Sequence, residues 1–122
     1  MIYTRLPPKR KRPRSGIERG PQRVWPHHER FVRSNPCSIL GCQITPVQFA
    51  HVRSAANSGT GLKPPSWDGI SLCVTHHQQQ HEVGQPAFER LYHIDLFAIA
   101  AAFVARSPDQ AMRDALKTQE DD

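Results

Sequence analysis

Apolar and polar positions in the middle of the chain predict two short β-strands separated by a loop. Residues 47–52 and 70–72 are mostly apolar and include β-branched or aromatic side chains, which favour strands. The segment between them, residues 54–67, is rich in Ser, Asn, Gly and Pro and is therefore expected to be a loop. The dipeptide Asp68-Gly69 is typical of a turn and leads into the second strand.

Helical spacing of apolar residues predicts five helices around these strands. Gly84 can cap the helix that follows the second strand, and Asp95 is a suitable N-cap for a later helix. The expected helices span residues 27–35, 73–83, 86–93, 95–106 and 109–118, the last of them marginal. The side chains expected to face the core are Phe88, Leu91, Tyr92, Leu96, Ile99, Ala100 and Phe103. Two strands with these helices indicate an α+β fold.

Size and composition limit the class of protein. A chain of 122 residues with 38% hydrophobic and 7% aromatic content predicts one domain with a modest core, which a structural metal would help to fold. Three cysteines argue against a secreted disulfide scaffold and favour a reducing, cytoplasmic setting. The longest apolar run, residues 96–105, is too short for a bilayer about 30 Å thick, and no apolar signal segment opens the chain, so no membrane partner is expected.

Positive charge is concentrated at the start of the chain. Ten of the sixteen Lys and Arg residues fall within residues 1–33. The prolines and scarce apolar residues of segment 1–26 predict a disordered basic arm, followed by a folded domain over residues 27–106 and a marginal helix with an acidic tail over residues 107–122. Such an arm suggests nucleic acid as a partner, although a solvated tail is the other interpretation. The arm residues expected to bind nucleic acid are Lys9, Arg10, Lys11 and Arg12.

Four residues have the spacing of a structural zinc site. Cys37 and Cys42 form a C-x4-C pair, and Cys73 and His76 form a C-x2-H pair at an expected helix start. Structural zinc takes four such ligands in a tetrahedron, often supplied as two close pairs. Because the set uses every cysteine in the chain, we expect it to bind zinc. The other interpretation is three unrelated buried thiols.

A second candidate metal site follows on the same helix. His77 and His81 are four residues apart, so they lie about 40° from each other and can clamp a transition metal. Taken alone, the pair is better explained as two surface histidines on a Gln-rich helix, but its place directly after a zinc ligand favours metal binding. His51 ends the first predicted strand, and the strand–loop–helix order would bring it opposite the other two histidines. A neutral imidazole there can act as a general base.

These residues resemble the HNH endonucleases, also called ββα-metal or His-Me finger nucleases. The similarity is carried by Ala50-His51-Val52 and by the run from Asp68 to His81. Residues 31–37, 50–53 and 59–64 look like a short phage and prophage branch that is similar to the phage recombination-enhancement nuclease, and the H-x3-H ending is similar to that of the colicin nucleases. The resemblance covers roughly residues 27–100. It implies a small zinc-stabilised ββα-metal core of two strands and a metal-binding helix, with flanking helices.

The resemblance also implies roles for individual residues. His51 corresponds to the histidine that activates water, and Asp68 to the position that orients the active-site loop. His77 and His81 correspond to the ligands of one divalent cation, which would be Mg²⁺, Mn²⁺, Ni²⁺ or Zn²⁺. The implied activity is hydrolysis of DNA phosphodiester bonds, leaving 5′-phosphate and 3′-hydroxyl ends. The implied partner is DNA, including single-stranded DNA or recombination intermediates, and the implied source is bacterial or phage-encoded.

Two functions stay open at the level of sequence. Ala50 stands where many family members have a metal ligand, and Asp68 stands where many have Asn. These departures favour a non-catalytic, zinc-stabilised nucleic-acid-binding module, whereas the intact set of three histidines favours the nuclease. The residues near the site that are expected to hold phosphates, or else to be surface cations, are Arg53 and Lys63. A zinc deaminase is excluded because its H-x-E and P-C-x-x-C signatures are missing.

Overall fold

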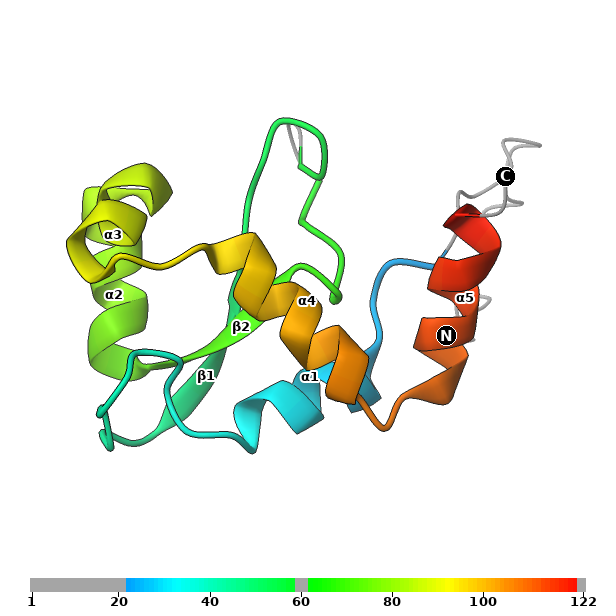
Figure 1. Ribbon diagram of the computed structural model, residues 1–122, viewed down its shortest axis with the longest axis horizontal. Helices are drawn as coiled ribbons and strands as arrows, with labels where there is room; N and C mark the ends of the chain where they lie inside the picture. The colour runs from blue at the N-terminus through cyan, green and yellow to red at the C-terminus, as the bar shows by residue number, and fades with distance from the viewer. Residues whose placement is uncertain (1–21, 59–61, 121–122) are drawn as a thin grey trace, which may run out of the picture.

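Two antiparallel strands form the centre of the protein (Figure 1). The computed structural model describes residues 22–58 and 62–120. In it, β1 (Val47–His51) pairs with β2 (Gly69–Cys73) so that the last residue of β1 lies opposite the first residue of β2. The two predicted strands are therefore confirmed, and each lies within one or two residues of its expected bounds.

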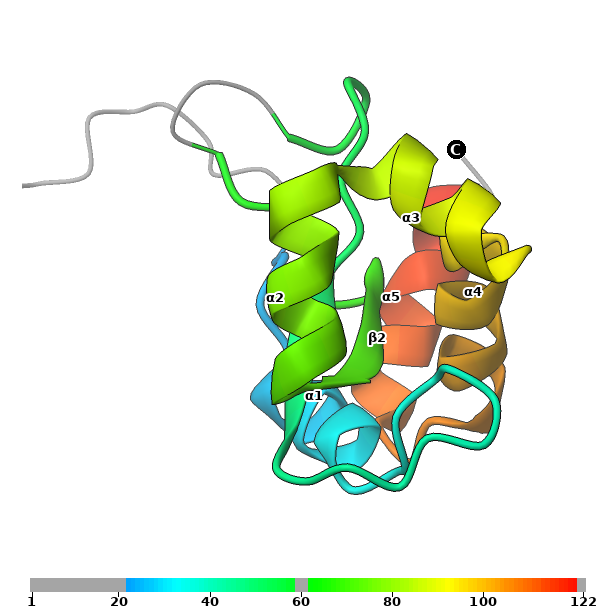
Figure 2. The same ribbon diagram turned by 90° about the vertical axis from the view of Figure 1, so that its left-hand side faces the viewer.

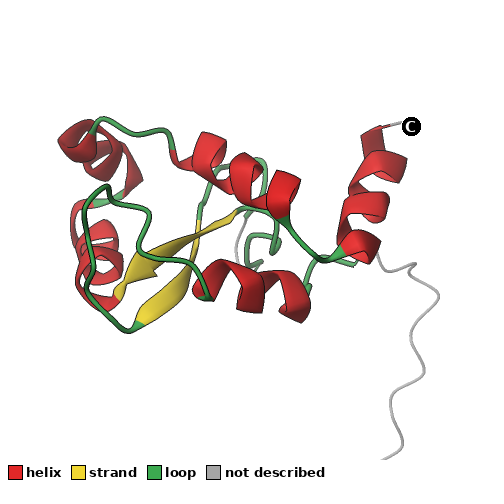
Figure 3. Ribbon diagram, turned by 60° about the horizontal axis from the view of Figure 1, so that its bottom comes forward, coloured by secondary structure: helices red, strands yellow, loops and turns green. Residues whose placement is uncertain are grey.

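Five helices surround this pair in the described part of the chain, as predicted, and give an α+β fold. α1 (Pro26–Arg33) packs on both strands and α4 (Leu96–Arg106) packs on β2. α2 (Val74–Val83) continues directly from β2, and α3 (Gln85–Tyr92) lies beside it (Figure 2). α5 (Gln110–Glu120) lies at the end of the molecule opposite α2 and α3 (Figures 1 and 3). None of these helices combines the length and apolar character needed to cross a bilayer.

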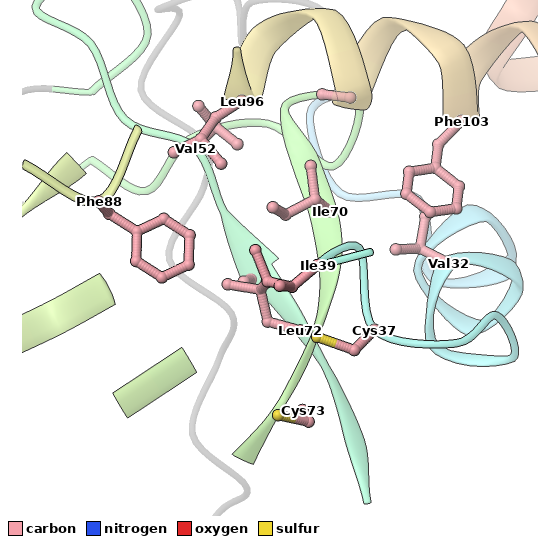
Figure 4. Close-up of a cluster of buried hydrophobic side chains, with 12 residues drawn as sticks. Val32, Cys37, Ile39, Val52, Ile70, Leu72, Cys73, Phe88, Leu96 and Phe103 are labelled. Atoms are coloured by element: carbon pink, nitrogen blue, oxygen red, sulfur yellow. The ribbon is translucent and has the colours of Figure 1, made fainter. Parts of the chain in front are cut away.

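The core lies on β2, all of whose residues are buried (Figure 4). Ile70 and Leu72 meet side chains from the loop after α1, from the end of β1 and from α4. Burying a side chain of this size contributes about 1.5–3 kcal/mol each, so this small cluster supplies much of the apolar stabilisation. The cluster consists of Val32, Cys37, Ile39, Ala50, Val52, Ile70, Leu72, Cys73, Phe88, Leu96, Ala100 and Phe103.

Residues 22–26 contact the folded domain, so the predicted arm was drawn too long. The Arg23 guanidinium donates to the backbone oxygen of Asn57 at 2.7 Å, and the Arg23 carbonyl accepts from the backbone of Ser66 at 2.9 Å. The backbone N–H of Trp25 donates to the Ser66 hydroxyl at 2.8 Å. Hydrogen bonds to the loop between the strands hold this segment. The sequence of the segment, which is poor in apolar residues, did not indicate these contacts. Residues 1–21, with Lys9, Arg10, Lys11 and Arg12, lie outside the described residues.

The prediction of which α3 side chains face the core is wrong at one position. Phe88 is fully buried and its ring lies 4.9 Å from that of half-buried Tyr92, but Leu91 is 55% exposed. α3 is short and packs mainly on α2, which covers only a narrow stripe of its surface. Helical spacing places Leu91 about 60° from Phe88, and that angle puts it beyond the covered stripe.

The last helix, α5, was predicted to be marginal, but it is held to the rest of the fold by buried contacts. Met112 is fully buried, and its backbone N–H donates to the Asp109 carboxylate at 3.1 Å, which caps the start of α5. His28 of α1 is also fully buried, and its Nδ1 lies 2.7 Å from the Ser107 hydroxyl. These contacts join the segment that begins at residue 107 to α1, so it is part of the folded unit.

Candidate metal centre and active site

Three cysteines and a histidine converge on one point at the junction of β2 and α2. One donor atom from each of Cys37, Cys42, Cys73 and His76 lies within 4.8 Å of all the others. The Sγ atoms of Cys42 and Cys73 are 3.8 Å apart. The Nδ1 atom of His76 lies 3.4 Å from Cys37 Sγ and 3.2 Å from Cys73 Sγ.

These spacings suit a tetrahedral metal ion. Zinc bonds of about 2.3 Å to sulfur and about 2.05 Å to nitrogen give tetrahedral edges of about 3.8 Å between sulfurs and about 3.6 Å between sulfur and nitrogen. The measured separations match the first value and fall slightly below the second. Thiolate and imidazole are the donors that zinc prefers in structural sites. The cluster can therefore hold a metal ion such as zinc, as the spacing predicted.

Local structure explains how the four ligands meet. Gly41 has φ +81°, a conformation that favours glycine, and it turns the chain so that Cys42 returns to hydrogen-bond Ile39 at 3.0 Å. The buried Ser71 of β2 donates to the backbone oxygen of Pro36 at 2.8 Å, which holds the turn against the strand. Cys73 is the N-cap of α2 and accepts from the backbone N–H of His76 at 3.3 Å.

Metal binding at this cluster would release thiol protons, because a metal ion binds thiolates. Burial raises the pKa of Cys37 to about 11, although backbone donors oppose the rise. Burial also acts to raise the pKa of Cys73, but hydrogen bonds from the His76 backbone and from the neighbouring thiols outweigh it and lower that pKa. A metal ion binds thiolates, so the Cys37 proton must leave when the ion enters, and metal affinity will weaken as pH falls.

The second predicted pair, His77 and His81, is also brought together. Their Nε2 atoms are 3.1 Å apart on the surface of α2. Two imidazole nitrogens about 2.1 Å from one metal ion lie about 3.0–3.4 Å apart when the angle at the metal is between square and tetrahedral. The pair therefore has the spacing of two ligands of one cation. Within the described residues, these two histidines belong to no group of three or more convergent ligands.

The pKa of the half-buried His77 ring is lowered, which favours the neutral form that a metal ligand needs. Burial lowers its pKa below 6.5, and the nearby charges of His81 and His51 lower it further. Its Nδ1 atom lies 2.8 Å from the side-chain oxygen of Gln48 on β1. His81 is exposed, so one member of the pair is fixed against the sheet and the other faces solvent.

His51 ends β1 as predicted, with its ring half-buried against Phe49. The two rings meet edge to face with centroids 5.0 Å apart. Phe49 in turn lies over Gly69, where an added Cβ would come within 2.0 Å of the Phe49 ring. Glycine at this position therefore lets the tip of the Phe49 ring approach β2 closely while the ring contacts His51. Burial lowers the pKa of His51 below 6.5; Glu29 opposes the shift, while Arg53 and Lys63 add to it.

His51 and His81 line the same cavity, which has a volume of about 190 Å³. The other residues that line it are Arg53, Gln80, Gly84 and Gln85. Gln85 clamps the chain just after His51: its amide accepts from the Arg53 N–H at 2.5 Å and donates to the Arg53 carbonyl at 2.7 Å. The cavity thus joins the end of β1 to α2 and to the start of α3.

Asp68 lies at the base of the loop between the strands. Its backbone oxygen accepts from Val52 N–H at 2.8 Å, and its carboxylate accepts from the Asn57 amide at 3.0 Å. The same Asn57 amide donates to the Val52 carbonyl at 2.8 Å, and its oxygen accepts from Ser54 N–H at 2.7 Å. Asn57 is therefore the residue that ties the end of β1, the loop and Asp68 together.

Sequence reasoning missed the side chains that support the site. Ser71 was detectable, because it is a polar residue between two apolar ones in a predicted strand. Gln48, Asn57 and Gln85 carry no such signal, since each is polar and lies where polar residues are ordinary. Their importance comes from partners 29, 11 and 32 residues away in sequence.

Fold and site together define a small α+β protein with a Cys3His cluster that can hold a metal such as zinc. Beside the cluster, three further histidines on β1 and α2 lie around a cavity and a candidate cation site. Comparisons of this chain with protein-family models, with curated proteins and with solved structures found no match. Function has to be argued from the residues of the site.

Proposed function

We propose that this protein is a metal-dependent DNA endonuclease of the HNH, or ββα-metal, type. The observation that carries the proposal is the convergence of His77 and His81 at 3.1 Å, with His51 and His81 lining one cavity. The order β1, β2, α2 agrees with the strand–strand–helix core expected of that family. The cluster of three cysteines and His76 would be its separate structural zinc site.

In the proposed reaction, His51 is the general base. Its lowered pKa favours the neutral imidazole, which can take a proton from water as that water attacks the phosphorus atom. The bond from phosphorus to the 3′ oxygen breaks, leaving 5′-phosphate and 3′-hydroxyl ends. His77 and His81 would hold a divalent cation, which when bound offsets negative charge on the phosphate and on the leaving oxygen.

Two exposed cations near His51 would bind the DNA backbone in this proposal. Arg53 lines the cavity with His51, and Gln85 fixes its backbone by two hydrogen bonds. Lys63 is close enough for its charge to lower the pKa of His51. Contacts from such residues to phosphate position the duplex without reading its sequence. DNA as the partner rests on these cations and on the basic first segment of the chain.

One observation favours a zinc-stabilised nucleic-acid-binding module as the second candidate. Ala50, next to His51, is fully buried and has no ligand atom to offer a cation. The cation would then have two protein ligands, with water and phosphate completing its coordination. Mg²⁺ commonly binds proteins through one or two protein ligands with waters, but prefers oxygen, whereas imidazole suits Ni²⁺ and Zn²⁺.

Cation-dependent nicking of plasmid DNA tests the nuclease directly. Zinc-loaded protein should nick DNA only when Mg²⁺, Mn²⁺ or Ni²⁺ is added, and His81→Ala should reduce the rate at least tenfold because it removes one of two cation ligands. The exposed His27 on α1 provides the matched control, and His27→Ala should cut at the wild-type rate. Folded, zinc-loaded protein that cuts neither DNA nor RNA with any of these ions would favour the binding module instead.

The pH dependence of cleavage should report the environment of His51. The imidazole must be neutral to accept a proton, and burial lowers its pKa while Arg53 and Lys63 add to the shift and Glu29 opposes it. Activity should therefore fall in acid with a midpoint below 6.5, measured as kcat/KM at saturating cation. A midpoint above 6.5 would contradict the assignment of His51 as the base.

A further inference from the structure

Gln48 contacts the candidate cation site from the strand side. Its side-chain oxygen lies 2.8 Å from Nδ1 of His77, and this contact joins the middle of β1 to the first turns of α2. With the amide oriented as in the structure, the Gln48 oxygen faces His77 and accepts, and the contact then requires a proton on Nδ1 of His77. In a neutral imidazole this leaves a lone pair on the other ring nitrogen, Nε2.

That lone pair is the one that faces His81. The two Nε2 atoms are 3.1 Å apart. Side chains alternate along a strand, so Gln48 shares a face of β1 with Ala50. Ala50 is fully buried and carries no donor or acceptor on its side chain. Gln48 is therefore the polar side chain that β1 presents on this face.

We propose that Gln48 is a positioning residue for the cation: it holds His77 as the Nδ1–H tautomer and so aims the Nε2 lone pair at the site shared with His81. Metal-binding histidines almost always donate their second ring nitrogen to such a partner, which fixes the ring and raises its basicity. Gln48 compensates in part for a strand that supplies no ligand at Ala50. The use of the cation in cleavage rests on the proposed function, but tautomer and affinity can be measured without cleavage.

The first test is the tautomer of His77 in the zinc-loaded, wild-type protein without added cation. Nitrogen-15 NMR of the histidine rings distinguishes Nδ1–H from Nε2–H directly. We expect His77 to be Nδ1–H, and Gln48→Leu to shift it towards Nε2–H. An Nε2–H tautomer in the wild-type protein would overturn the proposal, whatever the variants do.

The second test is a calorimetric titration with Ni²⁺, a probe that imidazole ligands bind well, with the zinc content checked before and after. Gln48→Leu should weaken binding about 10–100-fold, and Gln48→Glu, which keeps an acceptor, should retain or improve it. Gln78→Leu is the matched control, because Gln78 is exposed on α2 and contacts Glu82 instead of a ring. Equal affinities of Gln48→Leu and Gln78→Leu would refute the role. The expected tautomer and affinity changes in a protein that cuts no nucleic acid would uphold it and reject the nuclease.

Discussion

Removal of the metal from the Cys3His cluster is expected to abolish the cooperative unfolding transition of this protein. Cys73 is fully buried, ends β2, caps α2 and lies 3.8 Å from Cys42, so the cluster joins three parts of the chain. Structural zinc binds small domains with about 10–16 kcal/mol, which equals or exceeds the total stability of about 5–15 kcal/mol of an ordinary domain. Thermal melting followed by circular dichroism, with and without a strong chelator, measures the effect.

The variant Cys73→Ser should behave like the chelated protein, and its zinc content should fall below one ion per chain. Thr75→Ser is the matched control: Thr75 is exposed on the same turn of α2, so its stability should change by less than about 0.5 kcal/mol. A melting curve that is the same in protein verified to be free of metal would show that the apolar core alone holds the fold.

The parts of this structure that sequence predicted well are those fixed by local spacing. The pair Cys73 and His76 lies on one turn, and His77 and His81 lie on one face, whatever surrounds the helix. β2 ends in Cys73 and continues into that helix. The buried Ser71 of β2 hydrogen-bonds the backbone of Pro36, and this contact brings Cys37 and Cys42 within reach of Cys73 and His76. The four candidate metal ligands could therefore be named from the chain alone, and their convergence is confirmed.

The parts that sequence could not predict depend on which distant segments meet. Leu91 is apolar and at helical spacing from Phe88, but the width of the covered stripe on α3 is set by α2. The side-chain oxygen and nitrogen of Gln85 both hydrogen-bond the backbone of Arg53. Any exposed backbone segment could have served as this partner, so the sequence did not indicate which one would. Amide side chains are adaptable partners, so their targets become visible only after the strands and helices are placed.

The position of His51 could be predicted from the sequence, but its electrostatic environment could not. Its place at the end of β1 followed from sequence, but its pKa depends on burial and on charges at Glu29, Arg53 and Lys63. Arg53 is two residues from His51 in sequence, but Glu29 and Lys63 are 22 and 12 residues away, so the combined effect of the three charges could not be assigned beforehand. A histidine on a strand is more often structural than reactive, and the shared cavity with His81 is what favours the reactive interpretation here.

Replacement of His51 by alanine is expected to reduce the cleavage rate about 10²–10⁴-fold, the usual contribution of a general base. The loss should appear in kcat, because His51 takes the proton only as water attacks. DNA affinity should stay within about twofold, since the phosphate contacts are assigned to Arg53 and Lys63. Initial nicking rates on plasmid DNA at saturating cation, with binding measured separately by fluorescence anisotropy, distinguish the two effects.

The folding control for His51→Ala is its melting curve with zinc bound, which should keep the wild-type transition because the ring is only half-buried. Loss of His51 should also remove the acidic limb of the pH profile, since the group that titrates is gone. A variant that still cuts at the wild-type rate would mean that another group activates water. A rate that falls only in step with DNA affinity would mean that His51 binds the substrate. The base is identified only if kcat falls while binding and the zinc-dependent fold remain, because no structural role of the ring produces that combination.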